Sequence, residues 1–216
     1  MGGRTFRRSA ENGAAGKFAD RTRKLVYVAL FAALTAALSL TSVPMPSGVP
    51  VTLQTFAVAF AAFVLGWKYG AAAILVYIAV GAAGAPVFSG FTGGVYKLVG
   101  LTGGFIWGFI PFVVLAGAPW AHKNAAAALA SAFAGLAVCH ILGVTQFTLV
   151  SGGTWQSAFL TVSLPYILKD ALSLVIAYKI AQAAGKRIKT PFEGVCNKNT
   201  AIKQKSIGGD YDQERQ

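Results

Sequence analysis

Residues 25–67 form a run of 43 positions without a single charged side chain. The hydrocarbon core of a bilayer is crossed by a helix of about 20 mainly apolar residues, so this run is too long for one span. It is interrupted by Pro44, Pro46, Gly48 and Pro50, residue types that break helices. We therefore predict two membrane-spanning helices here, over about residues 25–40 and 51–66.

Four more apolar runs follow, and polar or glycine-rich turns separate them. They cover about residues 70–84, 103–120, 125–150 and 157–183, the last of them interrupted by Pro165. The chain is 55% hydrophobic and only 12% charged, whereas about 25% of the residues in a typical soluble domain are charged. This composition excludes a soluble globular domain and a disordered chain. We predict an all-α integral membrane protein with six transmembrane helices over residues 25–184.

Basic residues gather at the two ends of the chain. Residues 1–24 and 185–216 are polar, hold seven Lys or Arg each, and are predicted to be mobile cytoplasmic tails. The turns with Lys68 and Lys123 would lie on the same side, whereas the opposite loops contain only Lys97. Because Lys and Arg accumulate in cytoplasmic loops, we expect both termini in the cytoplasm. A nucleic-acid partner is not expected, since it would need this charge on a folded polar surface.

Asp170 is the only acidic residue between Asp20 and Glu193, and it lies well inside the last apolar run. A charge at the centre of a membrane helix costs about 2.5–3.5 kcal/mol on insertion scales, and such residues usually face a cavity or a partner. Lys169 is its neighbour, but adjacent helix positions point about 100° apart, so the two are not expected to form a well-aligned pair. Two interpretations stay open: one of them faces a ligand cavity, or a Lys–Asp pair ties two helices together.

The segment 85–102 is rich in glycine and carries the polar residues Ser89, Thr92 and Lys97. Glycine lets a backbone approach a small molecule closely, and the polar side chains would supply hydrogen-bond donors. A flexible outer loop is the alternative interpretation. For Gly104 and Gly108 the four-residue spacing favours close packing between helices instead.

The second apolar run begins with Thr52, Gln54 and Thr55 at its outer end. A buried amide needs a hydrogen-bond partner, so Gln54 is a candidate binding residue, with an interfacial cap as the alternative. His140 lies in an apolar run and is interpreted as a hydrogen-bonded core residue. It is a weaker candidate than Asp170.

The first apolar run carries a stripe of small residues that includes Ala29, Ala33, Ala36 and Ala37. Small residues permit close contact between helices in lipid, where no hydrophobic force drives helices together. Packing inside the protein and docking of an external membrane partner both fit this stripe.

Several expected signatures of other functions are missing from the sequence. It has no GxxxxGK[ST], HExxH or GxSxG motif, and one carboxylate provides no acid–base pair. Cys139 and Cys196 have no metal-binding spacing, so Cys139 is interpreted as apolar packing and Cys196 as a thiol in the tail. We expect neither an enzyme nor a cofactor or metal, and an ion-coupled pump is poorly supported.

Five segments together resemble the signatures of the BioY family. They are Val49–Thr55 (VPVTLQT), Gly66–Gly70 (GWKYG), Gly81–Phe88 (GAAGAPVF), Gly93-Gly94 followed by Gly100–Phe105 (GLTGGF), and Pro165–Asp170 (PYILKD). Each motif is weak by itself, but five in the family's order are specific. They cover the membrane part of the chain, about residues 24–185.

This resemblance implies a biotin-binding S component of an energy-coupling factor (ECF) transporter, which captures biotin on the outer side of a prokaryotic plasma membrane. It implies as partners a transmembrane coupling protein and two ATPase subunits that drive import. By the same resemblance, the coupling protein would dock on the small-residue face that holds Ala29, Ala33, Ala36 and Ala37. Asp170 matches the family's Asp and would accept hydrogen bonds from the ureido N–H groups of biotin, with Tyr166 and Phe91 as the wall.

The sequence also departs from the family pattern. Leu101 replaces a proline, and Ser173 stands where the family has a lysine. We expect Lys169 or Lys97 to supply the missing positive charge for the carboxylate of biotin. Two other functions stay open: an S component for a different vitamin, and a membrane scaffold that does not transport.

Overall fold

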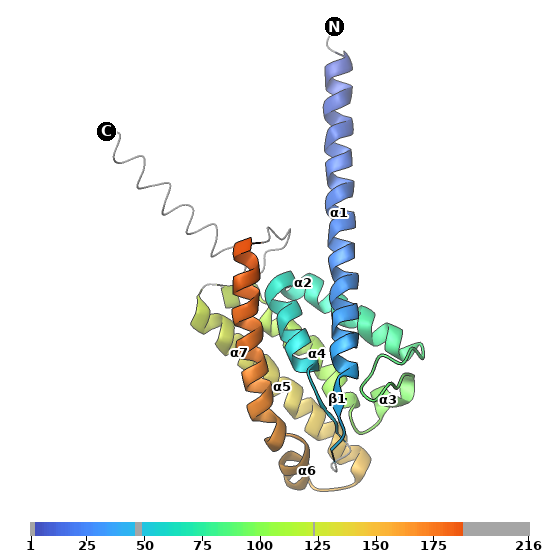
Figure 1. The fold of residues 1–216 in the computed structure, drawn as a ribbon, viewed down its shortest axis with the longest axis vertical. Helices are drawn as coiled ribbons and strands as arrows, with labels where there is room; N and C mark the ends of the chain where they lie inside the picture. Colours follow the sequence, from blue (N-terminus) through green and yellow to red (C-terminus); the bar gives the residue numbers. More distant parts are fainter. Residues whose placement is uncertain (1–2, 46–48, 123, 188–216) are drawn as a thin grey trace, which may run out of the picture.

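Figure 1 shows the computed structural model, which describes residues 3–45, 49–122 and 124–187, with side chains over 18–45, 49–121 and 124–185. Helices dominate the described chain, and they occur in the order α1 (Gly3–Leu40), β1 (Ser42–Val43), β2 (Val51–Thr52), α2 (Gln54–Ala82), α3 (Val95–Val99), α4 (Gly103–Ala116), the 3-10 helix η1 (Pro119–His122), α5 (Ala125–Ser151), α6 (Trp155–Val162) and α7 (Leu164–Arg187).

Helix α1 begins earlier than the hydropathy pattern predicts. It starts at Gly3, so most of the predicted tail over residues 1–24 is helical, and its mobility and cytoplasmic location stay predictions. The segment is free of proline and contains many Arg, Lys and Ala residues, which favour helix. At the other end of the chain α7 extends to Arg187, and the rest of the predicted tail, residues 188–216, lies outside the described residues.

The proline-rich segment after α1 ends the helix as predicted. It forms a short antiparallel hairpin in which Ser42 pairs with Thr52 and Val43 with Val51. This small sheet is a departure from the all-α prediction. The hairpin brings Thr52 and the start of α2 next to the end of α1.

Helix α2 is two helical runs joined at Gly66. Gly66 has φ 72° and ψ 179°, a backbone conformation that suits glycine because it has no Cβ. The backbone N–H of Trp67 donates to the carbonyl of Gly117 at 3.0 Å instead of bonding within the helix. Figure 1 shows the two runs leaving this point in different directions, as the predicted turn at residues 67–69 requires.

The last apolar run is bent at Ser163. Helices α6 and α7 meet there at 49°. The sequence pointed to Pro165 as the interruption, but Pro165 lies in the first turn of α7, where a missing N–H costs nothing. The bend places Ser163, rather than the proline, at the junction.

Three described helices are long and apolar enough to cross a membrane: Phe18–Leu40, Gln54–Ala82 and Ala125–Ser151. The bent pair α6–α7 is a fourth candidate span, and α4 is apolar but has only 14 residues. Burial fits a lipid environment, since Leu149 and Leu168 are 79% and 80% exposed whereas Thr35 and Ser39 are fully buried. The chain is a helical multi-pass membrane protein.

Helix α4 packs along α5 through glycines, as predicted for Gly104 and Gly108. A Cβ at Gly108 would lie 2.8 Å from both the Cα and the Sγ of Cys139, which leaves no room for a side chain. Cys139 is 3% exposed, so its interpretation as a packing residue is confirmed. This close contact fixes the position of α5, and therefore of His140, relative to α4.

Candidate ligand-binding site

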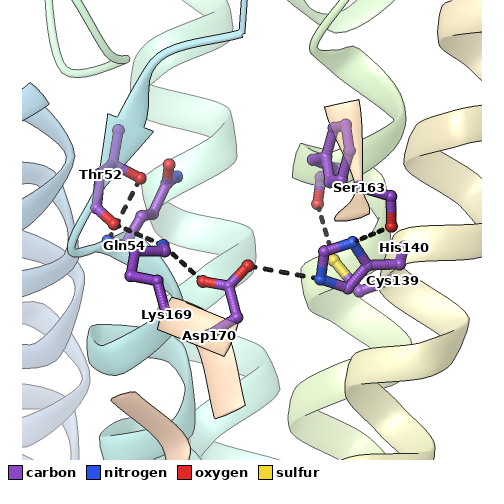
Figure 2. Close-up of polar contacts among 8 residues, drawn as sticks. Thr52, Gln54, Cys139, His140, Ser163, Lys169 and Asp170 are labelled. Carbon is purple, nitrogen blue, oxygen red and sulfur yellow. Dashed lines mark hydrogen bonds and ion pairs between the residues drawn. The ribbon is translucent and has the colours of Figure 1, made fainter. Parts of the chain in front are cut away.

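Asp170 lies on α7 with 5% of its surface exposed and is held between two basic side chains. Its Oδ2 atom is 3.3 Å from Nε2 of His140 on α5. Its Oδ1 atom is buried, contacts the ammonium of Lys169, and receives no well-directed hydrogen bond from the described residues. Figure 2 shows Lys169, Asp170, His140 and Ser163 in one row across the helices.

The contact between Lys169 and Asp170 is a correction to the sequence prediction. Adjacent positions point in different directions on a helix, but four flexible methylene groups let the Lys169 ammonium return to the neighbouring carboxylate. The same ammonium donates to the carbonyl of Thr52 at 2.8 Å. Lys169 therefore ties α7 to the hairpin strand β2 as well as to Asp170.

His140 is more central than its sequence interpretation suggested. It is a buried, hydrogen-bonded residue as predicted, but one of its partners is the candidate binding carboxylate. Its other ring nitrogen, Nδ1, is 2.8 Å from Oγ of Ser163. The one available sequence signal was an imidazole in an otherwise apolar run, 30 positions before Asp170.

A cavity opens beside Asp170 between α2, α4, α5 and α7. Its volume is about 70 Å³, and because one water needs about 10–15 Å³ of cavity, it has room for several. Its lining is mainly apolar and aromatic with a few polar groups: Val49, Pro50, Thr52, Gln54, Thr55, Tyr77, Phe88, Ser89, Thr102, Phe105, Ile106, Phe109, Leu136, Cys139, His140, Val162, Tyr166, Lys169 and Asp170.

Five of the eight residues predicted to bind substrate line this cavity. They are Gln54, Ser89, Tyr166, Lys169 and Asp170. The structure thus brings together residues from the start of α2, the loop after α2, and α7, which together span more than 100 positions of the sequence.

The other three predicted residues, Phe91, Thr92 and Lys97, do not line the cavity. A bridge between Phe88 and Thr92 closes a tight turn in which Phe91 has φ 56°. This turn directs Phe91 outward, with 70% of its surface exposed, whereas Phe88 is 1% exposed. Phe88 is therefore the aromatic residue of this loop that lines the cavity, and Phe91 does not.

Tyr77 is a cavity residue for which the sequence provided no signal. Its hydroxyl accepts a hydrogen bond from Nε2 of Gln54 at 2.8 Å and lies 3.1 Å from Oγ of Ser39. It joins both runs of α2 to α1 beside the cavity. Ser173, at the position of the family's lysine, is 7% exposed and does not line the cavity.

The alanine stripe on α1 divides between two faces. Ala29, Ala33 and Ala37 are exposed and follow one another at four-residue intervals, whereas Ala36 is half-buried and packs against the core. Ala36 therefore belongs to the internal packing of the protein and not to the exposed face.

The row Ser163–His140–Asp170 contains the residue types of a hydrolytic triad but not its arrangement. In such a triad the base that activates the serine is Nε2, and the aspartate orients Nδ1. Here the serine contacts Nδ1 and the aspartate Nε2, and Ser163 is fully buried. The described residues contain no cluster of ligands for a metal ion. The arrangement is suited to binding a small molecule rather than to transforming one.

Comparison with known proteins gives a consistent result. Residues 9–190 match the sequence profile of the BioY family. The chain is 38% identical over 160 residues to the biotin transporter BioY of Thermotoga maritima, covering 74% of this chain and 94% of that protein. It is 36% identical over 162 residues to a probable biotin transporter BioY of Pyrococcus horikoshii, covering 75% of this chain and 96% of that protein.

A solved structure has the same fold. It is the crystal structure at 2.1 Å of the S-component for biotin from an ECF-type ABC transporter. The TM-score is 0.71 at 22% sequence identity, and the match covers 78% of this chain and 93% of the other.

Proposed function

The chain belongs to the BioY family, and from that membership we propose that it captures biotin as the S component of an ECF transporter, not as an enzyme. The observation that carries this proposal is a buried carboxylate at the edge of a partly aromatic cavity, with one oxygen paired to a partly exposed lysine. Such a site suits a neutral ring with N–H donors and an apolar body. Biotin has this chemistry in its ureido ring.

Asp170 is the acceptor for the ureido N–H groups in this proposal. A charge-assisted hydrogen bond is about twice as strong as one between neutral groups. The bicyclic ring would lie against Phe88 and Tyr166. Because the Lys169 ammonium contacts Oδ1, it moves aside in this proposal when a ureido N–H donates to that oxygen.

Lys169 then becomes the partner of the biotin carboxylate. Of the two lysines expected for this role, Lys169 lines the cavity and Lys97 does not. The ammonium already reaches the carbonyl of Thr52, so a small swing of the side chain keeps one polar partner while it releases Asp170.

We further propose six transmembrane spans with both termini in the cytoplasm of a prokaryotic plasma membrane. The break at Gly66 divides α2 into two spans, and α4 and the bent pair α6–α7 supply two more beside α1 and α5. The exposed Ala29, Ala33 and Ala37 are the docking face for the transmembrane coupling protein, which links the S component to two ATPase subunits.

The test is a titration of the purified protein with biotin, thiamine and riboflavin, with Asp170→Asn beside the wild type. We expect biotin alone to bind, and the substitution to weaken it about 10–100-fold, because a hydrogen bond to a charged group contributes about 1.5–3 kcal/mol. Binding of another vitamin would identify a different S component. Failure of the wild type to bind any of the three would support the scaffold function.

A further inference from the structure

The two oxygens of Asp170 have different surroundings, and this difference points to a function for His140. Oδ2 meets the ring of His140, a buried group on a different helix. Oδ1 meets Lys169, whose side chain is 27% exposed and which can move. One partner is fixed in the core, and the other lies at the cavity surface.

The ring of His140 is held from three sides. Phe105 of α4 packs edge-on against it, with ring centroids 5.8 Å apart and an interplanar angle of 89°. Its Nδ1 atom faces the Ser163 hydroxyl, and its Nε2 atom faces Asp170 (Figure 2). These three contacts favour one orientation of the imidazole.

Ser163 is itself fixed by the bend between α6 and α7. Its N–H donates to the carbonyl of Phe159 at 3.1 Å, and its carbonyl accepts from the N–H groups of Tyr166 and Ile167. Because Ser163 is fully buried in this junction, its hydroxyl has a fixed position beside His140.

The hydrogen-bond pattern selects one tautomer of the neutral ring. A carboxylate only accepts hydrogen bonds, so the nitrogen that faces Asp170 must carry the proton. Nε2 is then the donor to Oδ2, and Nδ1 accepts from the Ser163 hydroxyl. A serine hydroxyl can either donate or accept, so the carboxylate of Asp170 selects the tautomer and Ser163 matches it by donating to Nδ1.

From this geometry we propose that His140 is a positioning residue for the ligand-binding carboxylate, and that Ser163 holds its ring by donating to Nδ1. His140 anchors Oδ2 and so presents Oδ1 to the cavity in one orientation, ready for an N–H donor of the ligand. A preorganised acceptor increases affinity because less freedom is lost on binding. This inference rests on the proposed function, which assigns the ligand to Asp170.

The first test is a set of biotin titrations on purified variants. His140→Leu removes the donor to Asp170. We expect it to weaken biotin binding about 10–100-fold, as for loss of a hydrogen bond to a charged group. His140→Gln can place its Nε2 amide near the same point, so we expect it to restore most of the affinity. Ser131→Ala is the matched control, since it removes a hydrogen bond from α5 to α4 away from the cavity.

A double-mutant cycle separates positioning from simple packing. If His140 acts through Asp170, His140→Leu has little further effect in an Asp170→Asn background. An equal loss of biotin affinity in the wild-type and Asp170→Asn backgrounds would overturn the inference. Wild-type affinity in His140→Leu would overturn it too. Thermal unfolding and gel filtration of the ligand-free variants identify any that fail to fold, and if His140→Leu is among them, Ser163→Ala replaces it in the cycle.

A second measurement does not depend on biotin. The chain has two histidines, so ¹⁵N NMR of the labelled imidazoles can assign His140 by its loss in His140→Gln. We expect the tautomer protonated at Nε2 in the wild type, and a mixture of tautomers in Asp170→Asn, because an amide can both donate and accept. The opposite tautomer in the wild type would contradict the inference even if biotin does not bind, whereas failure of biotin binding alone would contradict only the proposed function.

Discussion

At the scale of single residues, the site depends on how a buried negative charge is compensated. An unpaired charge in a low-dielectric interior is costly, and removing one partner of a buried pair leaves the other uncompensated. Asp170 divides the task between His140 and Lys169, one at each oxygen. The partly exposed Lys169 is the partner that a ligand can displace.

Lys169→Met tests the assignment of the second charge. If the ammonium faces the carboxylate of bound biotin, the variant should bind biotin about 10-fold more weakly, the lower end of what a charge-assisted hydrogen bond contributes. The affinity for biotin methyl ester should fall much less, because the ester has no anionic end. Calorimetric titration of both ligands measures the ratio. Lys97→Met is the control. If biotin affinity falls in that variant instead, Lys97 is the residue that pairs with the biotin carboxylate.

At the scale of elements, close helix contacts place the site residues. Helix α4 can approach α5 because Gly104 and Gly108 have no side chains at the contact. This approach sets the distance between Phe105 and His140. The bend at Ser163 similarly determines how α7 presents Asp170 to α5.

Gly108→Ala is predicted to destabilise the protein. The new Cβ would lie 2.8 Å from Cys139, and overpacking of this kind costs about 1–3 kcal/mol. Thermal unfolding in detergent should show a lower midpoint for the variant. Gly153→Ala is the control, since its Cβ would meet nothing closer than 3.4 Å. An unchanged midpoint for Gly108→Ala would mean that the α4–α5 contact is looser than described.

At the scale of the whole molecule, the loops with few basic residues and the basic C-terminal end of α7 lie at opposite ends. Figure 1 shows the β1–β2 hairpin and α6 at the end opposite the C-terminal end of α7. Large apolar side chains face outward along the helices, as expected for surfaces in contact with lipid. The cavity opens among the residues of the hairpin, near the proposed outer side.

Cysteine labelling tests this orientation. A membrane-impermeant maleimide should leave Cys196 unmodified in intact cells and label it after permeabilisation. Ser151→Cys, placed in a Cys196→Ser background, should be labelled in intact cells, because Ser151 is exposed at the far end of α5. Cys139 is buried and should contribute no signal in either case. Labelling of Cys196 in intact cells would reverse the proposed topology.

The docking face on α1 is testable by separating binding from transport. Ala33→Trp places a bulky side chain on the exposed four-residue stripe, so it should reduce biotin uptake by cells that contain the coupling module. Biotin affinity of the purified variant should not change, because Ala33 does not line the cavity. Leu149→Trp on another exposed surface is the control. Normal uptake by Ala33→Trp would move the docking site elsewhere.

Much of the candidate site was visible in the sequence because the environment is so apolar. In a chain with few charged side chains between the tails, Asp170 and Lys169 are conspicuous, and the cost of burying them implies a purpose. Gln54 was selected because a buried amide needs a partner. Phe91 and Phe88 were harder to distinguish, since one turn decides which of them points inward. Tyr77 could not be selected, because an aromatic residue in a membrane helix has no distinguishing pattern.

The sequence by itself determined that the chain enters a membrane, where its helices break, and that one acid had to be accommodated among apolar neighbours. These properties follow from composition and from residues such as Pro44 and Gly66, which act locally on the backbone. Tertiary structure alone decided that His140 and Lys169 share Asp170. Partners from different helices meet only when the rotation and spacing of those helices are set, and that depends on packing along the whole length of α4, α5 and α7.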